Sequence, residues 1–417
     1  MKQGSLVKQS PPNDIYFLIF FSLFWTKKIV LSYVRVILMH VPVIWGYTDA
    51  IITAAVYISF FMALPTFFSR VYVRELALFM WILLVYVAYF GLFRSTRAYF
   101  MRYSRVVVLQ VLPCLLLGSC LYYVDNRRLI QWIYKLSLIT VIAFCIYTIF
   151  FRVWSDKALR GGDMHSAYLF VPHVCLTYGY VLNKPRPLNI ITFAAGSVML
   201  LFLGTRGTLV CLGVYVIVTT LCSKRLKRPR LFLLCGILAM LILFAFGVLD
   251  FLYELAENLN LSVRIFKKIE EGQVATSSGR DNITGQIWGQ VLGSPVFGKG
   301  IYSDRLYMDG MYAHNVLLEC LLHFGFGGAL PLFAVVGCLF YRCFLALQKE
   351  QREEEKYFFL ALLCCTVVKL MMSSSYLLEN NLFLLIGYCR AVTRGKPSIA
   401  MLRLELCGSK QRLNLRR

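Results

Sequence analysis

Three polar groups in this sequence have the residue types needed to act on an anionic substrate. Arg206 opens the stretch "TRGTLV", Arg280 lies in "SSGRDNITG", and His314 precedes Asn315 at the mouth of the apolar run "VLLECLLHFGFGG". An arginine fork can hold a phosphate through two parallel hydrogen bonds, and a neutral histidine can accept a proton from a hydroxyl. Together they predict a pyrophosphate cradle beside a general base.

All three groups are predicted to lie near helix N-termini, where unpaired backbone amides and the helix dipole favour anions. Two nearby arginines would also favour the uncharged form of His314, which is the form that a base requires. Less specific interpretations remain for each residue taken alone. Arg206 is then a solvated turn residue, Arg280 a side chain extending to lipid headgroups, and His314 a satisfied interfacial residue.

The stretch around Arg280 predicts a helix over 277–292. Ser278 and Asp281 have the spacing of a capping box, and Ile283, Ile287 and Val291 recur at helical intervals. The pattern predicts an amphipathic helix that lies on the membrane surface.

The composition indicates that a membrane must position these groups. The chain has 417 residues, of which 59% are hydrophobic and 16% charged, and its mean hydropathy is +0.66. Soluble domains carry about a quarter charged residues. The basic excess lies in short loops and the C-terminal tail, which is a signal of membrane topology and argues against nucleic-acid binding. The fourteen cysteines lie in or beside apolar runs, so they are interpreted as buried hydrophobic residues.

Apolar runs long enough to cross a bilayer predict an all-α, polytopic bundle of about 12 transmembrane helices. Segment 15–25 is too short to cross and is interpreted as interfacial, with a merged first span as the alternative. The predicted spans are 29–47, 51–69, 76–93, 106–124, 129–150, 167–182, 188–204, 207–222, 231–249, 313–341, 357–372 and 375–390.

The predicted organisation has five parts. They are an N-terminal cytoplasmic or interfacial segment 1–28, spans one to nine over 29–249, an external catalytic loop 250–312, spans ten to twelve over 313–390, and a basic cytoplasmic tail 391–417.

Lysine and arginine content gives the orientation. "SKRLKRPR" (223–230) and the tail are basic, so both termini are predicted to be cytoplasmic and the large loop between spans nine and ten external. "RSTRAYFMRYSR" (94–105) contradicts the rule, because alternation places its four arginines outside. One violation is preferred to the inversion of six better-supported loops.

The motifs and their order resemble the O-antigen polymerase and O-antigen ligase superfamily of bacterial envelope glycosyltransferases. The similar stretches are "LFLGTRGTLV", "SSGRDNITGQIWGQVLGSPVFGKGIYSDR" and "AHNVLLECLLHFGFGGAL", with the weaker "RGGDMHSAYLF" before them. They cover roughly 160–340, and the first four spans match in hydropathy alone.

The resemblance implies a role for several positions. Arg206 and Arg280 resemble the family's two external arginines that hold the pyrophosphate of a lipid-linked sugar, and His314 resembles the histidine that activates the acceptor. Secondary candidates match the family's motifs with less defined roles; Arg305 belongs to a "G-x-G-x-x-x-D-R" stretch that could be only a loop turn. These are Arg160, Asn315, Glu319 and Arg305.

The resemblance also implies a setting in the bacterial inner membrane with the active site on its outer face. Its substrate would be a polyprenyl-pyrophosphate-linked oligosaccharide in the bilayer, and flippase and chain-length regulator proteins are expected partners. No cofactor or metal is expected, since family members are thought to act without one. The external loop agrees, because it contains no D-x-D pair and no His/Asp cluster with ligand spacing.

Three functions stay open at this level. The preferred one is a polymerase that joins lipid-linked repeat units into a capsule, exopolysaccharide or O-antigen. The second is a ligase that transfers the glycan to lipid A-core. The third is a transporter of lipid-linked oligosaccharide, which predicts inverted repeats and broken helices at the membrane midplane.

Polar residues inside spans are expected to face the bundle interior or an interface. Gly325, Gly327 and Gly328 are expected to let the tenth span pack closely against its neighbours, and Lys369 is expected to pair with Glu379. The other intramembrane polar residues are Arg35, His40, His173 and His323.

Overall fold

The structure is a computed structural model that describes residues 13–37, 42–71, 73–124, 126–154, 164–203, 205–224, 280–349 and 352–395, with isolated positions between 226 and 258. Every regular element in these ranges is helical, which confirms the predicted all-α class. The α-helices are α1 (Asn13–Ile37), α2 (Pro42–Arg70), α3 (Val73–Leu92), α4 (Arg97–Val106), α5 (Pro113–Tyr123), α6 (Asn126–Trp154), α7 (Met164–Asn183), α8 (Pro187–Phe202), α9 (Arg206–Cys222), α13 (Arg280–Leu292), α14 (Ser303–Tyr307), α15 (Val316–Lys349), α16 (Glu353–Met372) and α17 (Asn380–Arg394).

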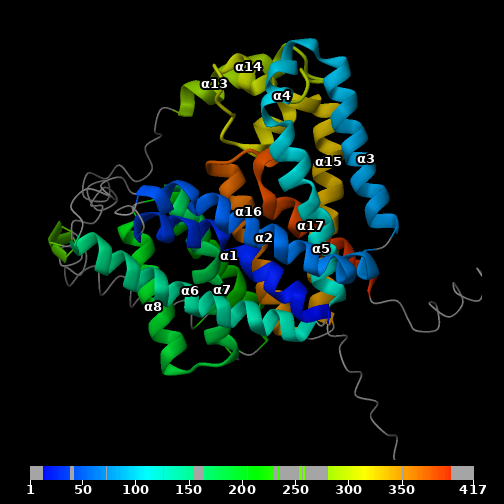
Figure 1. Cartoon of the computed structure of the whole chain (residues 1–417). Helices are drawn as coiled ribbons and strands as arrows, with labels where there is room; N and C mark the ends of the chain where they lie inside the picture. The colour runs from blue at the N-terminus through cyan, green and yellow to red at the C-terminus, as the bar shows by residue number, and fades with distance from the viewer. Residues whose placement is uncertain are drawn as a thin grey trace, which may run out of the picture.

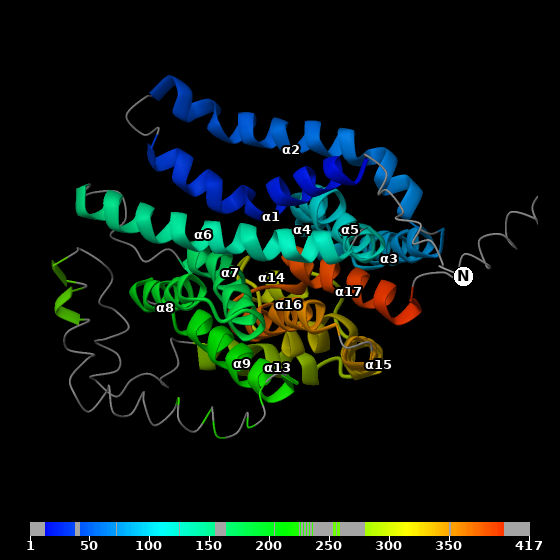
Figure 2. The same cartoon turned by 90° about the horizontal axis from the view of Figure 1, so that it is seen from below.

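The described helices include five that are long and apolar enough to cross a membrane. They are Tyr47–Ser69, Val73–Leu92, Arg94–Tyr123, Arg128–Thr148 and Val316–Lys349, and shorter apolar helices cover Ile15–Lys27, Pro187–Phe202 and Arg206–Cys222. The protein is therefore a multi-pass membrane protein. Figure 2 shows α1 and α2 side by side along one edge of the bundle, with α6 next to them and α7, α8 and α9 beyond.

The first predicted span differs from the structure. Segment 15–25, predicted to be interfacial, belongs to α1, which continues to Ile37, and α2 begins at Pro42. The range 29–47 is therefore not one helix, and the alternative of a merged first span fits better. Residues 38–41, most of span 231–249 and most of the loop up to 279 lie outside the described residues.

Polar contacts sort the connections to two ends of the bundle. At one end Glu75, which begins α3, pairs with Arg390 and Arg394 at the end of α17. The start of α16 lies at the same end of the bundle, and there the Lys356 ammonium donates to the Cys222 carbonyl at 2.8 Å. Basic stretch 223–230 follows Cys222 directly, so it starts at this end.

The opposite end holds α13, α14 and α4, which lie together at the top of Figure 1. The four-arginine segment 94–105 is held there through aromatic contacts: Phe100 and Tyr103 pack on Tyr302 of the long loop, with ring centroids 4.9 and 5.5 Å apart. This packing holds the segment at the end of the bundle opposite to the basic stretch 223–230, because Tyr302 is fully buried beneath it.

Helix α15 is broken at Gly325, and the loop fills the break. Gly325 has φ 64° and ψ −176°, so the helical hydrogen bonds around it are lost. The loop restores them: Lys299 and Gly300 amides donate to the Leu322 and His323 carbonyls at 2.7 and 3.0 Å. The amides of Phe326 and Gly327 donate in turn to the Pro295 and Val296 carbonyls at 2.6 and 3.0 Å. A broken helix in a membrane is tolerated where the protein satisfies its backbone in this way.

The glycines of α15 were predicted to allow close packing against neighbouring helices, but Gly325 and Gly327 pack against the loop instead. A side chain at Gly325 would come within 2.3 Å of the Val296 carbonyl oxygen, and one at Gly327 within 2.8 Å of the same atom. Their close contact is with the loop backbone, not with another helix. At Gly328 a side chain would meet Phe324 of α15 itself.

Replacing Gly325 by alanine should open this junction. Its φ and ψ are available essentially only to glycine, and strain of this kind costs about 1–3 kcal/mol. Gly325→Ala should therefore lower the thermal unfolding temperature of the purified protein in detergent. Gly337→Ala on the same helix is the matched control, because nothing lies within 4 Å of its added methyl group. Equal unfolding temperatures for the two variants would contradict the assigned role of the break.

Candidate functional site

His314 lies in the turn that leads into α15. Its backbone is left-handed, with φ 56°, and its half-buried ring lies 4.2 Å from the Tyr312 ring, centroid to centroid. Asn315 follows as the helix cap: its Oδ1 accepts hydrogen bonds from the Leu317 and Leu318 amides at 2.9 and 3.4 Å. The side chain of Asn315 therefore satisfies orphan amides at the start of α15.

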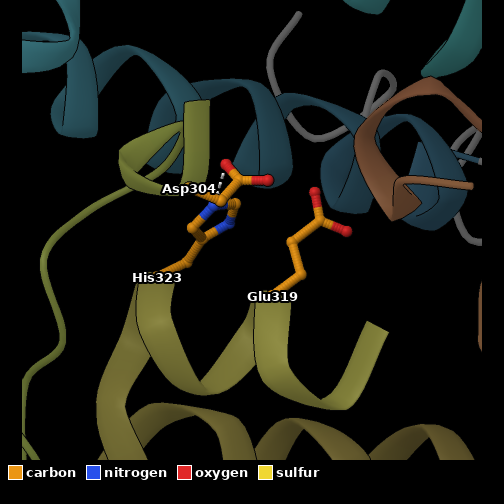
Figure 3. Close-up of side chains that lie close together, drawn as sticks. All are labelled: Asp304, Glu319 and His323. Carbon is orange, nitrogen blue, oxygen red and sulfur yellow. Dashed lines mark hydrogen bonds and ion pairs between the residues drawn. The ribbon is translucent and has the colours of Figure 1, made fainter. Parts of the chain in front are cut away.

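Behind this turn lies a buried ion network centred on Arg305. Its Nη1 donates to Asp304 Oδ2 at 2.5 Å and to Glu319 Oε1 at 3.0 Å. The side chains of all three residues are at most 1% exposed. His323, one turn after Glu319, places Nε2 3.0 Å from Asp304 Oδ1. Figure 3 shows Glu319 and His323 rising from α15 toward Asp304.

The network connects three parts of the chain that are far apart in sequence. Arg305 Nη2 donates to the Ser375 hydroxyl at 2.7 Å, and the Tyr376 amide donates to Glu319 Oε2 at 3.2 Å. Ser375 also donates to Glu319 Oε1. The loop, α15 and the α16–α17 connection are thus joined at one point.

The same network holds the turn that carries His314. The Ala313 amide donates to Asp304 Oδ2 at 3.2 Å, and the Tyr312 hydroxyl donates to the Ser373 carbonyl at 2.9 Å. The residues on the N-terminal side of His314 are therefore anchored to the network and to the end of α16. This arrangement can hold an imidazole at a fixed position at the rim.

Charge pairing decides the ionisation of the loop members. Burial by itself would raise the pKa of Asp304, but the hydrogen bond and charge of His323 and the charge of Arg305 outweigh it, and the pKa is lowered. Burial would lower the pKa of Arg305, but Asp304 and Glu319 raise it further. Asp304 is thus an anion and Arg305 a cation in the folded protein.

The network also brings together groups that can bind metals. Ligand atoms of Asp304, Glu319 and His323 lie within 4.8 Å of one another. The linear spacing of the loop did not reveal this cluster, because two of its members lie in α15. The Arg305 guanidinium already lies against both carboxylates and supplies the positive charge that a metal would bring. The residues therefore fit an ion-pair network better than a metal centre.

Arg206 is the first residue of α9, as predicted, and is partly buried. The helix start is packed tightly: a side chain at Gly207 would meet the Tyr168 hydroxyl of α7 within 1.8 Å. Lys369 near the end of α16 lies 5.7 Å from the centre of the Tyr168 ring and pairs with Glu379 at 2.6 Å. The pair with Glu379 was predicted, and the shared contact with Tyr168 places the start of α9 beside the end of α16.

Arg280 is the first residue of α13, so its predicted place at a helix N-terminus is confirmed; its side chain and the proposed cap Ser278 lie outside the described residues. The prediction that α13 lies on the membrane surface implied that lipid covers its apolar face, and the structure has protein there instead. Ile287 and Val291 are buried with Leu322 of α15, and Ile283 packs beside them. The apolar stripe has the same helical period whether protein or lipid covers it, so the sequence could not distinguish the two.

The structure places the secondary candidate site residues in different surroundings. Arg305 and Glu319 are buried in the ion network, where their charges face each other and not solvent. Arg160 lies outside the described residues. Sequence reasoning did not assign Asp304 and His323 to the site, although His323 was expected to face the interior and does. The signal was the spacing of four between Glu319 and His323, which places both on one helix face.

Removing the central cation should destabilise the protein strongly. Arg305→Met leaves two buried carboxylates without their counter-ion, and breaking a buried pair in this way costs about 3–5 kcal/mol. The triple variant Arg305→Met, Asp304→Asn, Glu319→Gln removes all three charges and should recover most of the loss. Chemical unfolding in detergent measures both. A single variant as stable as the parent, or a triple variant no better than the single, would contradict charge pairing as the role of Arg305.

Comparison with known proteins found one family model that matches part of this chain. Residues 191–333 match the family model described as O-antigen ligase, and the search of curated proteins found no match. The matched range contains Arg206, Arg280 and His314, together with the ion network of Asp304, Arg305, Glu319 and His323. The segment that carries most of the candidate site residues, residues 191–333, is therefore similar to the family described as O-antigen ligase.

Proposed function

We propose that the protein is a metal-independent membrane glycosyltransferase of the polymerase type, which joins polyprenyl-pyrophosphate-linked repeat units into a cell-surface polysaccharide. The observation that carries the proposal is the placement of His314 in an anchored turn, within a family-matched segment that also begins α9 and α13 with Arg206 and Arg280. We place the site on the outer face of a bacterial inner membrane, with both termini in the cytoplasm.

In the proposed reaction a sugar hydroxyl of the acceptor attacks the anomeric carbon of the donor glycan. His314 takes the hydroxyl proton as the new glycosidic bond forms. The bond between the anomeric carbon and the phosphate oxygen breaks, and the electron pair leaves with the polyprenyl pyrophosphate. Arg206 and Arg280, aided by the positive ends of α9 and α13, stabilise the charge that develops on this leaving group.

The matched description favours a second candidate, a ligase that transfers the finished glycan to lipid A-core. The chemistry at the anomeric carbon is the same, and the two enzymes differ in the acceptor. We prefer the polymerase because "GIYSDR…AHNVLLE" resembles capsule and exopolysaccharide polymerases more closely.

A transporter of lipid-linked oligosaccharide receives less support. It would use broken helices that expose backbone groups to a substrate near the midplane. The break in α15 is closed by four hydrogen bonds with segment 295–300, so the backbone groups of this broken helix are already satisfied.

Deletion of the gene in its native host distinguishes the candidates. Loss of a polymerase should leave surface glycans of a single repeat unit, because later units cannot be joined. Loss of a ligase should leave polymer that is not attached to lipid A-core. Electrophoretic length profiles of the surface glycan measure this, and restoration by the plasmid-borne gene is the control. An unchanged profile would contradict both enzymes.

His314→Gln tests the proposed base. Glutamine keeps the size and a hydrogen-bonding group but cannot accept the proton, and loss of general-base assistance costs about 10²–10⁴-fold in rate. Chain growth by the purified variant on lipid-linked repeat units should fall by this factor, with an unchanged unfolding temperature. Near-normal chain growth would sink the base assignment and leave His314 as a positioning residue.

A further inference from the structure

The arginine segment 94–105 has no role in the function proposed above. It carries four arginines and no acidic residue, at the end of the bundle that holds α13 and α14 (Figure 1). Arg94, Arg102 and Arg105 are exposed. Among the described carboxylates none forms an ion pair with these three arginines. A connection predicted outside the cytoplasm does not ordinarily keep such an unbalanced positive charge.

The fourth arginine has a structural task. Arg97 Nε donates to the Phe90 carbonyl and its Nη2 to the Gly91 carbonyl, both at 3.1 Å. These carbonyls are at the end of α3, where helical partners are missing, so Arg97 caps that helix. The three exposed arginines have no equivalent task within the described protein.

Helix α4 has two different faces: one packs against the protein, and the other carries exposed arginines. Phe100 is 1% exposed and packs on Tyr302, as does Tyr103. Arg102 and Arg105 are one turn apart, which places them on one face of the helix, away from Phe100. The aromatic contacts hold α4 rigid, so the arginines are presented on a fixed support.

Exposed apolar side chains lie next to these arginines in the sequence. Met101 is 70% exposed and Leu109 is 63% exposed, and both lie in Arg94–Tyr123, one of the helices long and apolar enough to span a membrane. Charged forks beside exposed apolar residues at the end of a span fit a ligand with a phosphate headgroup and an apolar tail. They do not fit nucleic acid, which lacks the tail.

Short contacts connect this segment to His314. The Arg305 guanidinium lies 5.8 Å from the centre of the Tyr103 ring and 5.9 Å from that of Tyr312, and Tyr312 lies 4.2 Å from His314. From Tyr312 a second route leads through Ser373 to the end of α16, beside the start of α9. One chain of contacts therefore connects His314 to the arginine segment, and another connects it to the part of the bundle where α9 begins with Arg206.

We propose that Arg102 and Arg105, with Arg94, bind the phosphate groups of the second lipid substrate, the acceptor whose hydroxyl His314 deprotonates. This inference rests on the proposed function, in which Arg206 and Arg280 hold the donor pyrophosphate. The two sites would hold two phosphate-bearing lipids in one leaflet, with their glycans meeting at the rim. Both acceptor candidates carry phosphate, so the inference holds for either enzyme.

Lipid stoichiometry tests the proposal. The full chain is purified in detergent, and native mass spectrometry counts bound polyprenyl pyrophosphate. The parent should bind two lipids. Arg102→Gln with Arg105→Gln should bind one, and so should Arg206→Gln with Arg280→Gln; the quadruple variant should bind none. The matched control is Arg74→Gln with Arg186→Gln, two exposed arginines outside the arginine segment, which should still bind two.

Kinetics and competition complete the test. In the purified assay the α4 double variant should raise KM for the acceptor by about tenfold or more, since hydrogen bonds to a charged group contribute about 1.5–3 kcal/mol each, while kcat changes less than twofold. Equal KM values for this variant and the parent would overturn the proposal. So would displacement of the second lipid by phosphatidylglycerol at equal concentration, which would mark a general headgroup site.

The outcomes separate the two proposals. If the Arg206 and Arg280 variant still binds two lipids while the α4 variant binds one, the donor assignment fails and the α4 site stands. If the α4 variant binds two lipids, the inference about α4 fails and the donor site is unaffected.

Discussion

The pairing of the buried Arg305 guanidinium with two carboxylates holds together the end of the bundle that contains α13 and α14. A charge at this depth is costly unless opposite charges and hydrogen bonds compensate it. Asp304 comes from the loop and Glu319 from α15, and Ser375 from the α16–α17 connection accepts the remaining contact. No two of these segments can move apart without exposing an uncompensated charge. The loop is therefore a fixed part of the bundle wherever it meets the network.

The break in α15 and the ion network reinforce each other. Gly325 ends the first half of the helix shortly after His323, and the amides of the loop occupy the carbonyls that the break leaves free. The loop then turns through Gly298 and Gly300, both with positive φ, and delivers Asp304 to His323. The backbone requirement of a membrane helix and the charge requirement of the network are met by the same stretch of loop.

These two constraints also position the turn that carries His314, a candidate site residue. The turn of His314 is attached through the Ala313 amide and the Tyr312 hydroxyl, while Asn315 caps the helix that follows. The half-buried ring of His314 is thereby held in one orientation at the rim. Tyr302, from the loop that also carries Asp304 and Arg305, attaches α4 to this end of the bundle. The exposed arginines of α4 therefore lie at the same end as the turn of His314.

Local sequence patterns were enough to predict the helical class, the five long apolar helices and the residues that begin α9 and α13, because apolar runs and helix starts are local properties. The sequence also predicted the Lys369–Glu379 pair, since two opposite charges inside neighbouring spans need each other. The expected lipid cover of the apolar face of α13 was wrong, because an amphipathic stripe does not specify whether protein or lipid covers it. The grouping of Asp304, Arg305, Glu319 and His323 was decided only by tertiary structure. Asp304 meets His323 only when the loop folds back onto the break at Gly325, and that contact depends on long-range backbone hydrogen bonds that no local pattern records.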